Sequence, residues 1–103
     1  MPKKRLTAEV AGELATLAVN GRLLSLKIDK YKSGKNKGQH YADYQEGERT
    51  ADIHTIRMLQ MIHRGLEEGK SYDIYFALKE DKPAFMRIVE LKGEEKFDAD
   101  DES

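Results

Sequence analysis

Apolar residues recur every three to four positions between residues 51 and 68. With this spacing they fall on one face of a helix of 3.6 residues per turn. That face consists of Ile53, Ile56, Leu59, Ile62, His63 and Leu66. Thr50 is a suitable N-cap, Asp52 falls in the first turn, where the helix dipole favours a negative charge, and Gly69 is a typical stop. The pattern predicts one main helix over residues 51–68.

Four further segments have the apolar patterns of β-strands. They cover residues 23–31, 40–45, 72–79 and 84–91. The first three alternate as half-buried strands do, whereas 84–91 is apolar on both faces and predicts a central or well-covered strand. Residues 32–39 contain two glycines and no apolar side chain, so they predict a mobile loop between the first two strands.

Residues 7–19 fit two structures, and the sequence leaves both open. In a helix, Thr7 would be the N-cap and Asn20-Gly21 the C-cap. In a strand, Asn20-Gly21 would form the type I′ turn of a hairpin. The helical interpretation makes Thr7-Ala8-Glu9-Val10 and Thr50-Ala51-Asp52-Ile53 the openings of two similar halves.

Both alternatives give an α+β fold with a mostly antiparallel sheet of four to five strands. With a strand over residues 7–19 the order is β-β-β-α-β-β, which resembles a small oligonucleotide-binding barrel at the level of fold class. With a helix there the order is α-β-β-α-β-β. Because unrelated functions share such folds, the resemblance implies an architecture and no function.

The charge divides the chain into two parts. Residues 93–103 contain six acidic residues and Lys96, a formal charge of −5, so the net charge of −1 leaves +4 for residues 1–92. We expect a single globular α+β domain over 1–92 and a disordered acidic tail over 93–103. A mildly basic domain with an acidic tail is typical of proteins that bind electrostatically.

The lack of cysteine removes disulfides and thiolate metal sites, and it favours a reducing compartment, so we expect a cytoplasmic location. No run of about 18 apolar residues predicts a membrane span. The basic residues after Met1 are not followed by an apolar segment, so no signal peptide is predicted.

The sequence contains no recognisable catalytic motif. None of the serines lies in G-x-S-x-G, and neither Gly34-Lys35 nor Gly69-Lys70 completes a phosphate-binding loop. His54 and His63 are nine positions apart on the predicted helix. They point to nearly opposite sides, so they cannot share a metal ion. We therefore expect a non-enzymatic protein without a cofactor or metal.

Basic and aromatic residues gather in the predicted hairpin around residues 32–39. We hypothesise that single-stranded DNA or RNA lies across it, with cations contacting phosphates and aromatic rings stacking on bases. The cationic candidates are Arg22, Lys27, Lys30, Lys32, Lys35 and Lys37, and the ring candidates are Tyr31, His40, Tyr41 and Tyr44. In this hypothesis the acidic tail competes with nucleic acid for the basic groove or recruits partners.

The alternative is a protein-binding inhibitor or adaptor of the kind that phages and mobile elements encode. Surface charge would then recognise a protein target, and Met58 and Met61 would line an adaptable helix face. An exposed apolar patch on the helix would favour this alternative and would also suggest a homodimer. A continuous lysine stripe beside exposed tyrosines would favour nucleic acid.

Overall fold

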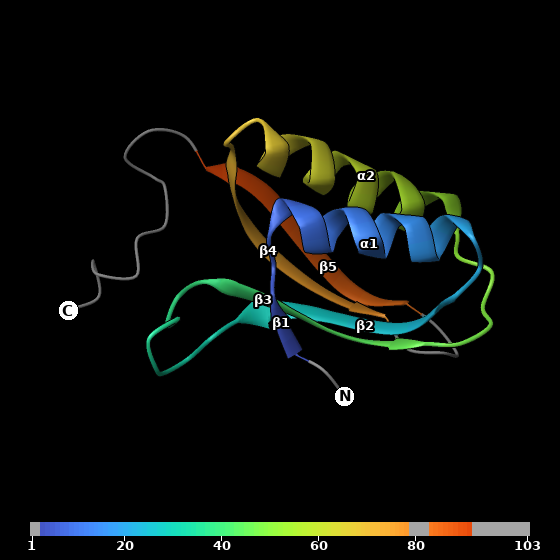
Figure 1. Cartoon of the computed structure of the whole chain (residues 1–103), viewed down its shortest axis with the longest axis horizontal. Coiled ribbons are helices and arrows are strands. Elements are labelled where there is room, and N and C mark those ends of the chain that lie inside the picture. Colours follow the sequence, from blue (N-terminus) through green and yellow to red (C-terminus); the bar gives the residue numbers. More distant parts are fainter. Residues whose placement is uncertain (1–2, 79–82, 92–103) are drawn as a thin grey trace.

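Five strands form one antiparallel sheet, and two helices cover one of its faces (Figure 1). The structure, a computed structural model, describes residues 3–78 and 83–91. The helices are α1 (Ala8–Val19) and α2 (Ile53–Glu67), and the strands are β1 (Lys3–Arg5), β2 (Leu23–Lys30), β3 (His40–Glu46), β4 (Ser71–Leu78) and β5 (Pro83–Leu91). The strand order is β1-β3-β2-β4-β5, with every neighbouring pair antiparallel. The predicted α+β class is confirmed, but the sheet is open, so the barrel alternative is wrong.

The chain consists of two helix-hairpin halves, α1-β2-β3 and α2-β4-β5. Strands β2 and β4 pair at the centre of the sheet, with Ile28 opposite Phe76 and Leu26 opposite Leu78. The two helices lie side by side and run in opposite directions above the sheet (Figure 1). This is the α-β-β-α-β-β order of the second alternative, with β1 added in front.

Residues 8–19 form a helix because both of its ends are capped and one face is apolar. The Thr7 hydroxyl accepts a hydrogen bond from the Val10 amide, 3.2 Å away. At the other end, Gly21 adopts a left-handed φ of 69°, and the amides of Gly21 and Arg22 donate to the carbonyls of Ala18 and Leu17. This Schellman motif uses the Asn20-Gly21 pair as a helix end, so the hairpin-turn alternative is wrong.

The start of α2 differs from the prediction. Asp52, and not Thr50, is the N-cap, and its carboxylate accepts hydrogen bonds from the amides of His54 and Thr55. Its Oδ1 atom accepts both bonds, and its full negative charge makes Asp52 the stronger cap for the exposed amides of the first turn. The helix therefore begins three residues after Thr50, whereas α1 begins directly after Thr7. The similar segments Thr7–Val10 and Thr50–Ile53 therefore do not occupy equivalent positions in the two helices.

The apolar face of α2 is narrower than predicted. Ile53, the first helical residue, is 52% exposed. The His63 side chain lies beside Gly12 of α1 and is 35% exposed, with its Nε2 atom 3.2 Å from a carboxylate oxygen of Glu67. His63 thus belongs to the border between the helices and not to the core, contrary to the prediction.

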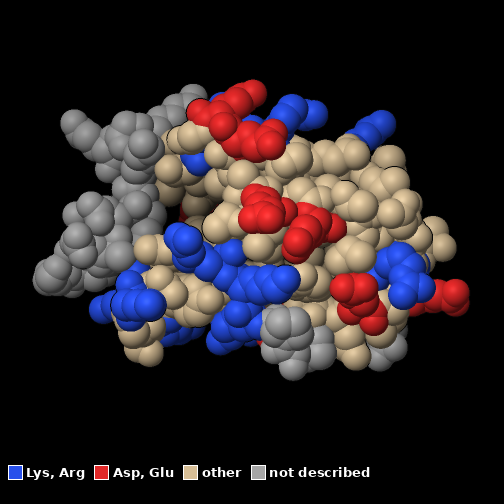
Figure 2. Space-filling view, in the orientation of Figure 1, with Lys and Arg blue, Asp and Glu red and all other residues tan. Residues whose placement is uncertain are grey.

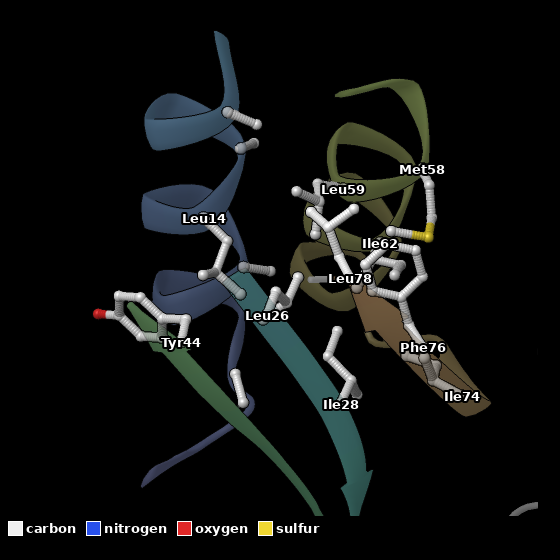
Figure 3. Packing of buried hydrophobic residues seen from close by; sticks show 14 of the residues in the cluster. Leu14, Leu26, Ile28, Tyr44, Met58, Leu59, Ile62, Ile74, Phe76 and Leu78 are labelled. Atoms are coloured by element: carbon white, nitrogen blue, oxygen red, sulfur yellow. The ribbon is translucent and has the colours of Figure 1, made fainter. Parts of the chain in front are cut away.

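The core fills the space between the helices and the sheet (Figure 3). Leu14 of α1, Leu59 and Ile62 of α2, and Ile28 and Phe76 of the sheet are fully buried. Burying a side chain of this kind stabilises a fold by about 1.5–3 kcal/mol. Because side chains alternate along a strand, the opposite face of the sheet carries the other residues of each strand, and in the described residues no helix covers that face.

Strand β5 is an edge of the sheet, which contradicts the prediction of a central strand over residues 84–91. Ile88 packs against the core, whereas Val89, on the other face, is 47% exposed. A strand with apolar residues on both faces is therefore packed against the core on one face only. Pro83 opens β5 and has no amide hydrogen to donate, which is typical of a first or edge position.

Gly65 of α2 offers a test of the packing between this helix and the sheet. A methyl group at Gly65 would lie 1.9 Å from the hydroxyl oxygen of Tyr72, whose side chain is buried. Replacing glycine by alanine normally favours a helix, but here the overpacking dominates. Gly65→Ala is expected to lower the free energy of unfolding by about 1–3 kcal/mol in chemical denaturation.

Gly12→Ala in α1 is the matched control for Gly65→Ala. Its added methyl group would lie 3.0 Å from the ring of His63, which is partly exposed and can turn away. We expect a smaller loss or a gain for Gly12→Ala. Equal losses at both glycines would contradict this account of the α2 packing.

Candidate nucleic-acid interface

Strand β1 adds basic residues to the β2-β3 hairpin. It pairs with β3, placing Lys3 opposite Asp43 and Arg5 opposite Tyr41, and the Leu6 amide extends the pairing by donating to the His40 carbonyl at 2.9 Å. The sequence predicted no strand here, because three basic residues carry no apolar periodicity. The run Lys3-Lys4-Arg5 was the only sign in the sequence of a further basic segment. The sequence could not show that this run lies beside the hairpin.

The exposed cations of the hairpin and of β1, apart from Lys4, which pairs with Glu13 of α1 at 3.7 Å, form what we call the basic surface. It consists of Lys3, Arg5, Lys27, Lys32, Lys35 and Lys37. Figure 2 shows Lys and Arg side chains gathered at the end of the molecule that holds β1 and the hairpin loop. The partly exposed carboxylates of Asp29 and Asp43 lie within the same hairpin, so the surface is positive but not exclusively so.

Two tyrosines lie beneath Lys3. The ring centroids of Tyr31 and Tyr41 are 5.1 Å apart and tilted by 54°, and the Lys3 ammonium lies 4.4 Å from the Tyr41 ring and 5.8 Å from the Tyr31 ring. These distances allow cation–π attraction. Tyr41 is 8% exposed, whereas Tyr31 is only partly buried. The Tyr31 ring therefore has exposed surface on which a base could stack, and the Tyr41 ring packs against it.

The loop between β2 and β3 is held by its own backbone. The Tyr31 amide donates to the Gln39 carbonyl at 2.8 Å, and the Gly38 amide donates back to the Tyr31 carbonyl at 2.9 Å. Gly34 and Gly38 have left-handed φ values of 86° and 88°, which glycine adopts without strain. The expected loop is thus confirmed in position, and it is a hydrogen-bonded turn that presents its three lysines.

The side chains of Lys30 and His40 contact strand β4 of their own domain. The Lys30 ammonium lies 2.9 Å from a carboxylate oxygen of Asp73, and Nε2 of His40 accepts a hydrogen bond from the Ile74 amide at 3.1 Å. Arg87 approaches the other Asp73 oxygen to 3.2 Å. These contacts connect the hairpin to β4. Lys30 and His40 therefore hold the base of the hairpin in place.

The charges at this junction shift two pKa values. Burial, followed by the positive charge of Lys30, lowers the pKa of His40 below its ordinary value of 6.5, so the ring stays neutral and can accept the Ile74 hydrogen bond. Burial alone would raise the pKa of Asp73, but Lys30, by hydrogen bond and charge, and Arg87 lower it overall. The junction therefore carries an ionised Asp73 beside a neutral His40.

Two predicted site residues lie away from the basic surface. Tyr44 faces the helices, where it is 6% exposed and belongs to the core, so it cannot stack on a base. The alternation of side chains along β3 sends it to the opposite face from Tyr41. Arg22 precedes β2 at the end of the sheet far from the loop. There its backbone forms an isolated parallel β-bridge with Arg49.

Comparison of the chain with family models, with curated proteins and with solved structures gave no match. Over residues 3–78 and 83–91, no group of three or more His, Cys, Asp or Glu side chains is placed to hold a metal ion. No helix among those residues has the length and apolar character needed to cross a bilayer.

The neutral state of His40 predicts a pH dependence of stability. Since the folded-state pKa lies below the ordinary 6.5, the unfolded chain takes up a proton first as the pH falls. The stabilisation is complete above the unfolded-state pKa and is lost progressively as the pH falls through the lower folded-state pKa. The free energy of unfolding should fall between about pH 7.5 and 5.5, and this fall should largely disappear in His40→Gln.

His54→Gln serves as the control for the pH experiment, because His54 is an exposed residue of α2. This variant should keep the pH dependence of the unmodified protein. An unchanged pH dependence in His40→Gln would show that a neutral His40 is not what the junction with β4 requires.

Proposed function

We propose that this domain is a non-enzymatic protein that binds single-stranded DNA or RNA on the basic surface. The observation that carries the proposal is the pairing of β1 with β3. It places Lys3 and Arg5 beside the loop lysines and sets a cation above the Tyr31–Tyr41 pair. Phosphate-binding cations and a stacking ring then occupy one continuous region.

The lysines supply the affinity for the phosphate backbone. Each phosphate contact releases condensed counterions, which gives binding that weakens steeply with salt. Lys32, Lys35 and Lys37 are exposed, and in the described part of the chain no carboxylate forms an ion pair with them. They remain free to contact a ligand, whereas Lys30 is occupied by Asp73.

The tyrosines favour a single strand over a duplex. Stacking of one base on an aromatic side chain contributes about 1–3 kcal/mol, and it requires a base that is not already stacked and paired. Tyr31 supplies the ring, and Lys3 above it meets the neighbouring phosphate. Lysine binds phosphate as a point charge, and Arg5 is the single arginine of the basic surface, so we expect little preference for sequence.

A second candidate is a protein-binding role for the helical layer. Val19 of α1 is 55% exposed, and Ile53 and Met61 of α2 are 52% and 39% exposed. Exposed apolar side chains favour a protein partner, as in an inhibitor or adaptor, or a second copy of the chain. This layer lies on the opposite side of the sheet from Tyr31, so the two functions use separate surfaces.

Paired charge variants test the nucleic-acid proposal. In fluorescence anisotropy with a labelled single strand of about 20 nucleotides, Lys35→Gln/Lys37→Gln should weaken binding. If both lysines contact phosphates, the slope of log K against log salt should become shallower by about 1.4, at about 0.7 per contact.

The control is Arg57→Gln/Arg64→Gln, which removes the same charge from exposed positions of α2. We expect its salt slope to match that of the unmodified protein. If the two double variants weaken binding equally, only net charge matters, and the assigned surface is wrong.

A further inference from the structure

Strand β5 ends at the same end of the sheet as the loop between β2 and β3. Leu91, the last residue of β5, pairs with Ser71. Ser71 lines a cleft of about 200 Å³ together with Gly38, Gln39 and Arg5, which belong to the loop and to β1. In Figure 1, β5 ends on the same side of the molecule as the hairpin loop. The last described residue therefore lies at the loop end of the sheet, one strand beyond the cleft that Ser71 shares with the loop.

The residues that follow have the opposite charge. Residues 93–103 carry −5, from Glu94, Glu95, Asp98, Asp100, Asp101 and Glu102 against Lys96. Their eleven residues can span roughly 36–40 Å, at about 3.3–3.6 Å each. Neighbouring strands are about 4.8 Å apart, so the distance from β5 to β3 is about 15 Å. The segment is long enough to reach the loop lysines and Lys3.

We propose that residues 93–103 bind the basic surface of their own domain and compete there with the nucleic acid. This inference rests on the proposed function. Carboxylates and one aromatic residue, Phe97, provide the two chemical groups that the surface is proposed to recognise in a strand, negative charge and a ring. Because the segment is joined to the domain, its effective concentration is in the millimolar range, which compensates for weak individual contacts.

Competition gives the chain a threshold for binding. A strand that makes several phosphate contacts displaces the segment, whereas a short oligonucleotide or an isolated phosphate does not. Salt weakens both the segment and the strand, so the loss of affinity with salt is smaller in the full chain than for a surface without competitor.

The test uses the full chain with Asp98→Asn, Asp100→Asn and Asp101→Asn. At about 50 mM salt, this variant should bind the labelled single strand at least about threefold more tightly than the unmodified protein. The matched control, Glu46→Gln, Glu48→Gln and Glu67→Gln, changes the same charge at exposed positions away from the loop. It should alter the affinity by less than about 1.5-fold, because distant charges are screened.

A second readout uses no nucleic acid. In ¹⁵N-labelled protein alone, the backbone amide shifts of residues 31–39 should differ between the unmodified chain and the Asp→Asn variant, and they should not differ in the control. Unchanged amide shifts would overturn the contact, and equal tightening in both triple variants would overturn the competition. If no variant binds the strand at low salt, the proposed function fails, and the amide shifts alone then decide whether the segment contacts the surface.

Discussion

The pairing of β2 with β4 is the interaction on which the rest of the structure depends. It sets Ile28 opposite Phe76 at the middle of the sheet, and both side chains are fully buried beneath the helices. Because the pairing is antiparallel, it places the two helix-hairpin halves so that α1 and α2 lie together on one face. The aliphatic core residues of the sheet, such as Leu26 and Ile28, lie on that face. The other face carries charged and aromatic residues together with the exposed Val89, and the hairpin loop projects beyond the helices.

The candidate site follows from this one-sided packing. Strand β1 extends the sheet on the β3 side and brings Lys3 and Arg5 to the exposed face, while Lys30 and His40 fix the base of the hairpin against β4. Supporting residues and ligand-facing residues are thus different sets. The helical layer, on the other side, has its own exposed apolar side chains. A domain of this size can in this way present two separate candidate surfaces around one core.

Local signals predicted most of the fold. The 3.6-residue period gave α2 to within two residues at its start, and the alternation gave the strands. The glycine end of α2 was also predicted, whereas Gly21 was a helix end in only one of the two alternatives; both glycines adopt the left-handed φ that a helix end favours. The edge position of β5 and the strand β1 depend on long-range pairing, whereas the local signals of residues 7–19 fitted both a helix and a hairpin strand. For the same reason the sequence could suggest a lysine-rich hairpin but could not show that Tyr44 faces the core.

The proposed function requires that a single strand stacks on Tyr31 at the basic surface. Photocrosslinking with a single strand of about 20 nucleotides that contains 5-bromouracil, followed by mass spectrometry, locates the base contact directly, because crosslinks form to rings in stacking contact. We predict that the main crosslink lies at Tyr31. Crosslinks confined to α1 or α2, or binding without any crosslink in the hairpin, would contradict the claim.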